Sequence, residues 1–160
     1  MSVLTDYLKT EAPHIRDESV RLKAAKLDWQ RAAQDLVHQM VEWLKVADPE
    51  GLLRVRQVDH AFEDYDLGRH VIKGLEVTFG RSTLRIIPSH LDVVGVIQVP
   101  GETSRRRIEG RFEFDNGTER RSLYRVKVAD RDTWLWWTHG GVGQPFDRES
   151  FEATVVSQLR

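Results

Sequence analysis

The chain has 160 residues, enough for one domain with a core of its own. Lys and Arg number 24 against 25 Asp and Glu, so the formal net charge is −1 and no overall field attracts nucleic acid or a membrane surface. The absence of cysteine excludes disulfides, thiolate metal sites and cysteine nucleophiles.

The first fifty residues are predicted to be helical. Residues 1–12 are expected to form a short helical or loose lead-in ending at Pro13, and a helix is expected from about Asp17 to Ala47, with Asp17 as its N-cap. Pro49 ends it, because the residue before a proline disfavours helical geometry. About 30 residues span about 45 Å, which is longer than a small domain, so the helix either breaks or extends beyond its own sheet. Its apolar residues recur every three or four positions and form one stripe, made of Ala25, Trp29, Ala32, Leu36, Met40, Trp43, Leu44 and Ala47.

From residue 51 to residue 139 the apolar pattern changes to period two, which predicts an antiparallel sheet of six to seven strands. Residues 146–160 predict a short helix capped by Asp147, with Phe146 and Phe151 as a hydrophobic staple. The fold class is therefore α+β in a single domain, with a long N-terminal helix, an antiparallel meander and a short C-terminal helix. The expected strands are 52–60, 72–79, 83–88, 92–99, 106–114, 119–128 and 133–138.

The apolar pattern also predicts the register of three hairpins, because a slip of one residue reverses every side chain. A two-residue Gly80-Arg81 turn pairs residue 79 with residue 82. A three-residue loop, 115–117, pairs residue 114 with residue 118. A four-residue loop, 129–132, pairs residue 126 with residue 135.

Three of the five tryptophans fall within four residues. In the preferred register Leu135 and Trp137 enter the core, while Trp134 and Trp136 share a face with basic side chains, where stacking and cation–π contacts form. A loop one residue longer or shorter reverses the faces, and either helix can instead cover this face. The expected partner-binding residues, for an acidic or aromatic partner, are Trp134, Trp136, Arg107, Arg111, Arg121, Arg125 and Lys127.

The acidic stretch between the first two expected strands contains residue types that bind metals. Its candidate ligands are Asp59, His60, Asp64 and His70. Carboxylates suit hard cations, and histidine adds affinity for zinc, iron or manganese. The spacing matches no ligand template, and a solvated acidic loop explains the same residues.

Three shorter patterns give weaker indications of a catalytic or binding site. Ser89, His90 and Asp92 supply the residue types of a hydrolase triad, but neighbours on a strand point to opposite faces. His139–Gly141 resembles an anion-binding turn, although a plain connection to the last helix is the preferred interpretation. Arg105–Arg107 is expected to be a basic loop entering a strand.

These observations predict a non-enzymatic protein-binding or accessory module that uses the Trp–Arg face and the amphipathic helix for docking or self-association. The expected partner is another protein or a second copy, with no cofactor and no metal. Single-stranded nucleic acid binding through the same face is the first alternative. A metal-dependent hydrolase is the second. No signal-peptide core and no membrane-length apolar run is present, so we expect a cytoplasmic protein without a membrane partner.

Overall fold

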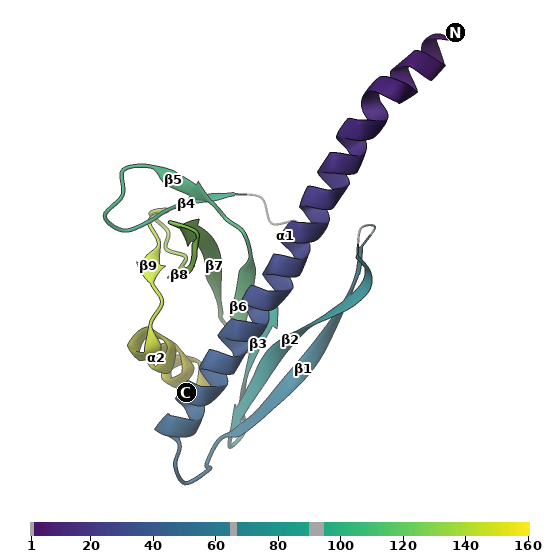
Figure 1. The fold of residues 1–160 in the computed structure, drawn as a ribbon. Helices are drawn as coiled ribbons and strands as arrows, with labels where there is room; N and C mark the ends of the chain where they lie inside the picture. Colours follow the sequence, from purple (N-terminus) through teal and green to yellow (C-terminus); the bar gives the residue numbers. More distant parts are fainter. Residues whose placement is uncertain (1, 65–66, 90–94) are drawn as a thin grey trace.

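The computed structural model describes residues 2–64, 67–89 and 95–160. It has a long N-terminal helix, a seven-stranded antiparallel sheet in the order β1-β2-β3-β6-β7-β8-β9 and a short C-terminal helix (Figure 1), which confirms the predicted fold class. Strands β4 and β5 form a separate two-stranded sheet. The elements are α1 (Val3–Ala47), β1 (Arg54–Asp64), β2 (Gly68–Phe79), β3 (Ser82–Pro88), β4 (Val96–Gln98), β5 (Arg105–Arg107), β6 (Arg111–Asp115), β7 (Arg120–Val128), β8 (Arg131–Trp136), β9 (Gln144–Pro145) and α2 (Arg148–Leu159).

Helix α1 is one continuous element of 45 residues. The predicted start at Asp17 is wrong: the N-cap is Ser2, whose Oγ accepts a hydrogen bond from the Thr5 backbone N–H at 3.1 Å. The helix passes through Pro13, because good helix formers on both sides outweigh the loss of one hydrogen bond. It ends at Ala47, as predicted, with Asp48 as its C-cap before Pro49.

Only the C-terminal part of α1 packs against the sheet. None of residues 2–28 is buried, and this part of the helix projects beyond the rest of the molecule (Figure 1). Ala25 and Ala47, at the two ends of the predicted stripe, are exposed. The 26 helical residues of this part, 3–28, span about 39 Å, so the helix extends beyond its sheet rather than breaking. The buried residues of α1 are Trp29, Ala32, Ala33, Leu36, Val37, Met40 and Leu44.

The predicted strand 106–114 is divided into β5 and β6. Gly110, between them, has a φ of 152°, and a Cβ there would lie 2.3 Å from the Trp29 ring. The close approach of this ring requires a glycine and ends the strand. As a result β3 pairs with β6, and the β4–β5 sheet packs on the other side of β7 and β8. Of the predicted strand 92–99, residues 92–94 lie outside the described residues and 96–98 form β4.

One of the three predicted registers is confirmed. Phe79 pairs with Ser82, and Gly80 has a φ of 60°, as a two-residue turn with glycine first requires. The three-residue loop 115–117 is wrong, because residues 116–119 form the loop and Phe114 pairs with Arg121. The Asn116 side chain accepts N–H groups from two loop residues, which stabilises the longer connection.

The predicted four-residue loop 129–132 is also wrong. Val128 pairs with Arg131, which leaves Ala129 and Asp130 as a two-residue turn. Both residues have positive φ values, 51° and 61°. Two positive φ values are typical of the two-residue turn whose backbone twist matches that of the flanking hairpin strands. The observed pairing of β7 with β8 differs from the predicted pairing by two residues. Because side chains alternate with period two, the residues of β7 and β8 that were expected to share a face still share it.

Candidate docking surface

The predicted Trp–Arg face exists but is not a surface. Trp134 shares a face with Trp136, as expected, but it pairs with Arg125, which the predicted register placed opposite Trp136. Helices α1 and α2 lie on this face, and Trp136 and Arg125 are fully buried. The Trp136 Nε1–H donates to Ser150 Oγ of α2 at 3.0 Å. The expectation of an exposed docking face at these residues is therefore wrong.

The other predicted partner-binding residues are divided between the two sides of the molecule. The Arg121 guanidinium lies 4.0 Å from the centre of the Trp136 ring, a cation–π contact in the core, and burial lowers the pKa of Arg121. Arg111 lies across from Tyr124 on the opposite face of the sheet. Arg107 is exposed in β5. The seven residues thus do not form one site.

The buried Arg125 is the centre of a charged cluster that joins α1 to the sheet. It pairs with Asp28 of α1 and with Asp132 of β8, and Arg31 lies 2.9 Å from both carboxylates. Lys127 lies 2.9 Å from Asp28. Burial alone would raise the pKa of Asp28, but hydrogen bonds from Arg125, Lys127 and Arg31 hold it far below its usual range. The cluster anchors α1 where its projecting part begins.

The metal-site prediction finds no support in the geometry. Among the described residues no group of three or more His, Asp and Glu side chains lies close enough to hold an ion. Asp59 and His60 are neighbours on β1, and burial lowers the pKa of His60. His70 stacks on the Phe62 ring with centroids 5.7 Å apart. The side chain of Asp64 lies outside the described part of the chain.

Described residues of the triad and turn patterns also form hydrogen bonds within the chain. Ser89 Oγ donates to a backbone carbonyl of β6 at 3.0 Å, while His90 and Asp92 lie outside the described residues. In the turn His139–Gly141, the Gly141 N–H donates to the Thr138 carbonyl at 3.0 Å, so that amide is already satisfied.

The basic run enters a strand as predicted, since Arg105–Arg107 form β5. The middle arginine, Arg106, donates to both carboxylate oxygens of Glu102, at 2.8 and 2.9 Å. This ion pair raises the pKa of Arg106 and lowers that of Glu102 through their hydrogen bonds. The middle of the run is thereby paired within the chain.

The projecting part of α1 carries large apolar residues that no other part of the described chain buries. Leu8, Ile15 and Leu22 follow one another at seven-residue intervals, and Leu4 lies one turn before Leu8. The four side chains, called here the apolar stripe, are 43–64% exposed. At the same spacing the stripe continues into Trp29, which is buried. One face of α1 is therefore covered by the sheet from Trp29 onward and is uncovered before it.

The sequence contains the signal for this stripe. A seven-residue apolar repeat drifts only about 20° per repeat around a straight helix, so it marks one face over several turns. The repeat was missed because Pro13 was expected to end a separate lead-in, which removed Leu4 and Leu8 from the pattern. Pro13 itself lies about 140° around the helix from Leu8, away from the stripe.

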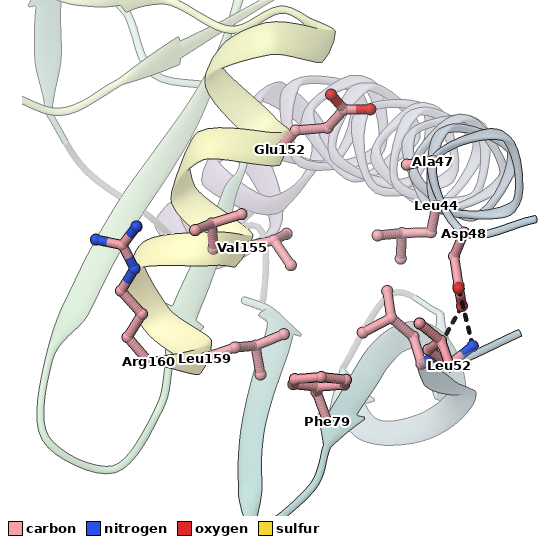
Figure 2. Close-up of a pocket in the computed structure, with 11 residues that line it drawn as sticks. Leu44, Ala47, Asp48, Leu52, Phe79, Glu152, Val155, Leu159 and Arg160 are labelled. Atoms are coloured by element: carbon pink, nitrogen blue, oxygen red, sulfur yellow. Dashed lines mark hydrogen bonds between the residues drawn. The ribbon is translucent and has the colours of Figure 1, made fainter. Parts of the chain in front are cut away.

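A second apolar feature is a cavity of about 530 Å³ between the end of α1, α2 and the β2–β3 corner. Figure 2 shows Leu44, Val155, Leu159 and Phe79 pointing toward one another across it. The Asp48 carboxylate at its edge accepts the backbone N–H groups of Leu52 and Leu53, each at 2.8 Å. That carboxylate is occupied within the chain, and the lining is almost wholly apolar, which suits an apolar side chain better than a reacting group.

The structure thus defines an α+β protein with a projecting helix that carries an exposed apolar stripe. No protein-family model, no curated protein and no solved structure matches the chain. No helix among the described residues is both long enough and apolar enough to span a membrane. Function is therefore inferred from the chain's own surfaces.

Proposed function

We propose that the chain is a non-enzymatic protein-binding module that docks through the projecting part of α1. The observation that carries the proposal is the apolar stripe, Leu4, Leu8, Ile15 and Leu22, which no other described residue buries. Exposed apolar side chains gathered on one face mark interaction surfaces. Most of the stability of a protein helix comes from packing its apolar face, so this segment gains stability by docking.

The spacing supports another helix as the docking element. Apolar residues at seven-residue intervals form the contact line of helices that pack side by side over several turns. Residues 2–28 carry five acidic and five basic side chains, so the segment has no net charge. Recognition here depends on apolar contact rather than on an electrostatic field, which favours a protein over a nucleic acid.

The globular part supplies a rigid base for the helix. The Arg125 cluster joins Asp28 to β7 and β8, and the Trp29 Nε1–H donates to the Ser89 carbonyl at 3.0 Å. These contacts fix the direction in which the helix leaves the sheet. A docking helix with a fixed direction loses less conformational entropy on binding than a tethered flexible segment.

Two matched substitutions test the proposal. Ile15 is 63% exposed and Val20 is 68% exposed, both are β-branched, and they lie about 140° apart around α1. Ile15→Glu is expected to weaken association about 100-fold, because it buries a carboxylate in an apolar interface. Val20→Glu is expected to change association less than about threefold, because it remains in solvent.

The measurement combines sedimentation velocity of the purified protein with affinity co-purification from cells that express it, using both variants. Circular dichroism verifies that both keep the helix content of the wild type. A chain that stays monomeric and retains no protein, or equal behaviour of the two variants, would contradict the proposal.

A further inference from the structure

We propose that the free edge of β1 and the cavity beside it bind an extended segment of another protein as an added strand, with an acidic residue between two apolar residues at its centre. This surface is separate from the apolar stripe, so it is tested independently of the proposed docking function. Three features of the described residues support it.

The first feature is a row of backbone groups without a partner strand. Among the described residues β1 pairs only with β2, over eleven residues without a bulge, and it lies at the edge of the sheet (Figure 1). The two-residue turn makes Phe79 and Ser82 a hydrogen-bonded pair, so alternate residues of β2, counted back from Phe79, bond to β3. The residues between them bond to β1. Val55 and Gln57 of β1 therefore direct their N–H and C=O groups away from the sheet, as a template for an added strand.

The second feature is a cavity of about 300 Å³ between the C-terminal end of α1 and the beginning of β1. Val41 and Leu44 line it from α1, and Val55 and Gln57 line it from β1. Residues of an added strand that lie opposite Val55 and Gln57 share their face of the sheet, so their side chains project toward this cavity. Val55 already pairs with the buried Val77 on its other side. Apolar residues therefore suit both of these positions in the partner.

The third feature is a row of alternating charges on the opposite face of the sheet. From β1 to β7, in strand order, the paired residues are Arg56, Glu76, Arg85, Asp115 and Arg120. Glu76 lies 3.1 Å from Arg56 and 3.6 Å from Arg85. The row ends at the free edge with Arg56, whose side chain is 65% exposed. An acidic residue opposite Arg56 continues the alternation, and opposite charges so placed stabilise strand pairing.

The sequence of β1 itself does not supply this pattern, which favours a different protein over a second copy. No acidic residue of β1 lies between two apolar ones, because Asp59 precedes His60 and Glu63 precedes Asp64. The pattern is present in the β2 segment that already pairs with this part of β1, Leu75–Val77. The free edge thus suits a segment that resembles β2 in its alternation of apolar and acidic residues.

Two capped peptides test the proposal, Ser-Thr-Leu-Glu-Val-Thr-Ser and the same peptide with Lys in place of Glu. Each is titrated to millimolar concentration into the full chain labelled with nitrogen-15, and NMR spectra record the shifts of the backbone amides. We expect the Glu peptide to shift the amides of Val55 and Gln57. We expect it to bind about fivefold more tightly than the Lys peptide, because the charge opposite Arg56 changes from attractive to repulsive.

Two charge reversals locate the acidic contact. Arg56 and Arg85 both pair with Glu76, and their side chains are 65% and 62% exposed, so each reversal places a carboxylate beside Glu76. Arg56→Glu is expected to reverse the preference, so that the Lys peptide binds more tightly. Arg85→Glu is expected to keep the preference for the Glu peptide, because β3 is two strands from the free edge. Circular dichroism verifies the fold of both variants.

A proline substitution tests the backbone contact. Gln57→Pro removes an outward N–H and leaves the ladder with β2 intact, so the fold is expected to tolerate it. Binding of the Glu peptide is expected to weaken about tenfold, because one hydrogen bond of the added strand is lost. Ala61→Pro is the control: its N–H also points outward, but it lies beyond a peptide centred on Arg56, so binding is expected to change less than about twofold.

Each outcome supports or overturns the proposal. Shifts at Val55 and Gln57, together with a preference for Glu that Arg56→Glu reverses, support it. Absence of these shifts, equal binding of the two peptides, or unchanged binding to Gln57→Pro overturns it. If the chain alone protects these amides by a self-association that Gln57→Pro abolishes, the edge belongs to a second copy and the proposal is also overturned.

Discussion

Replacing Trp136 with alanine is expected to lower the free energy of unfolding by about 4 kcal/mol, as for other buried aromatic residues truncated to alanine. The Trp136 ring is fully buried and packs edge-on against Phe114 and Phe146, with centroids 4.9 and 5.3 Å away. The substitution leaves a cavity, removes the hydrogen bond to Ser150 and takes the aromatic ring away from Arg121. Urea unfolding followed by circular dichroism measures the change.

The neighbouring tryptophan is the control. Trp137 is 40% exposed and contacts Tyr124 edge-on at 5.8 Å. Trp137→Ala is expected to cost about 2 kcal/mol, half the loss for Trp136→Ala, because 40% of Trp137 stays in water on folding. Equal losses for the two variants would show that the assignment of Trp136 to the core is wrong.

Arg125→Ala is the second substitution with a large expected effect, a loss of about 3 kcal/mol in the free energy of unfolding. Truncation removes the buried cation that Asp28 and Asp132 share. It also removes the hydrogen bond that Arg125 donates to the Glu109 carbonyl at 3.1 Å. Removing one member of a buried ion pair costs about 3–5 kcal/mol, because the remaining charge stays desolvated. We place the loss at the lower end because Arg31 still pairs with both carboxylates.

A surface arginine in an ion pair provides the comparison. Arg148 lies 3.1 Å from Glu152 on the first turns of α2, and both side chains are well exposed. Arg148→Ala is expected to change stability by less than about 0.5 kcal/mol, since such pairs are screened by water. Urea unfolding of both variants gives the comparison, and a loss for Arg125→Ala as small as that for Arg148→Ala would contradict the structural role of the cluster.

Features set by local chemistry were predictable from the sequence. The Gly80-Arg81 turn depends on one glycine with a positive φ, and its register is confirmed. Asp147 caps α2 by accepting the Ser150 N–H at 2.7 Å, and Phe146 and Phe151 pack together as the predicted staple. In each case the residues involved are close in the chain, so short-range rules apply.

Features set by contacts between distant parts of the chain were not predictable. Trp134 and Trp136 lie on the same face of the strand, as predicted. Their exposure depends on the positions of α1 and α2, and the apolar pattern of a strand carries no information on those positions. Trp137 was expected in the core and is exposed. The break at Gly110 follows from a ring of α1 about 80 residues earlier. Tertiary packing of this kind overrides local propensity.

The most direct test of the docking account compares thiol reactivity at two leucine positions of α1. Leu22 is 43% exposed and Leu27 is 49% exposed in the single chain, so thiols in Leu22→Cys and Leu27→Cys would react at similar rates if nothing covered the helix. Leu22 lies on the apolar stripe, whereas Leu27 lies about 140° away around the helix. At concentrations at which the native protein is docked to its partner, we expect a bulky thiol reagent to modify position 22 at least tenfold more slowly than position 27. In urea, which unfolds the protein, we expect equal rates at the two positions. Equal rates in the native protein would contradict the claim that this face of the helix is a docking surface.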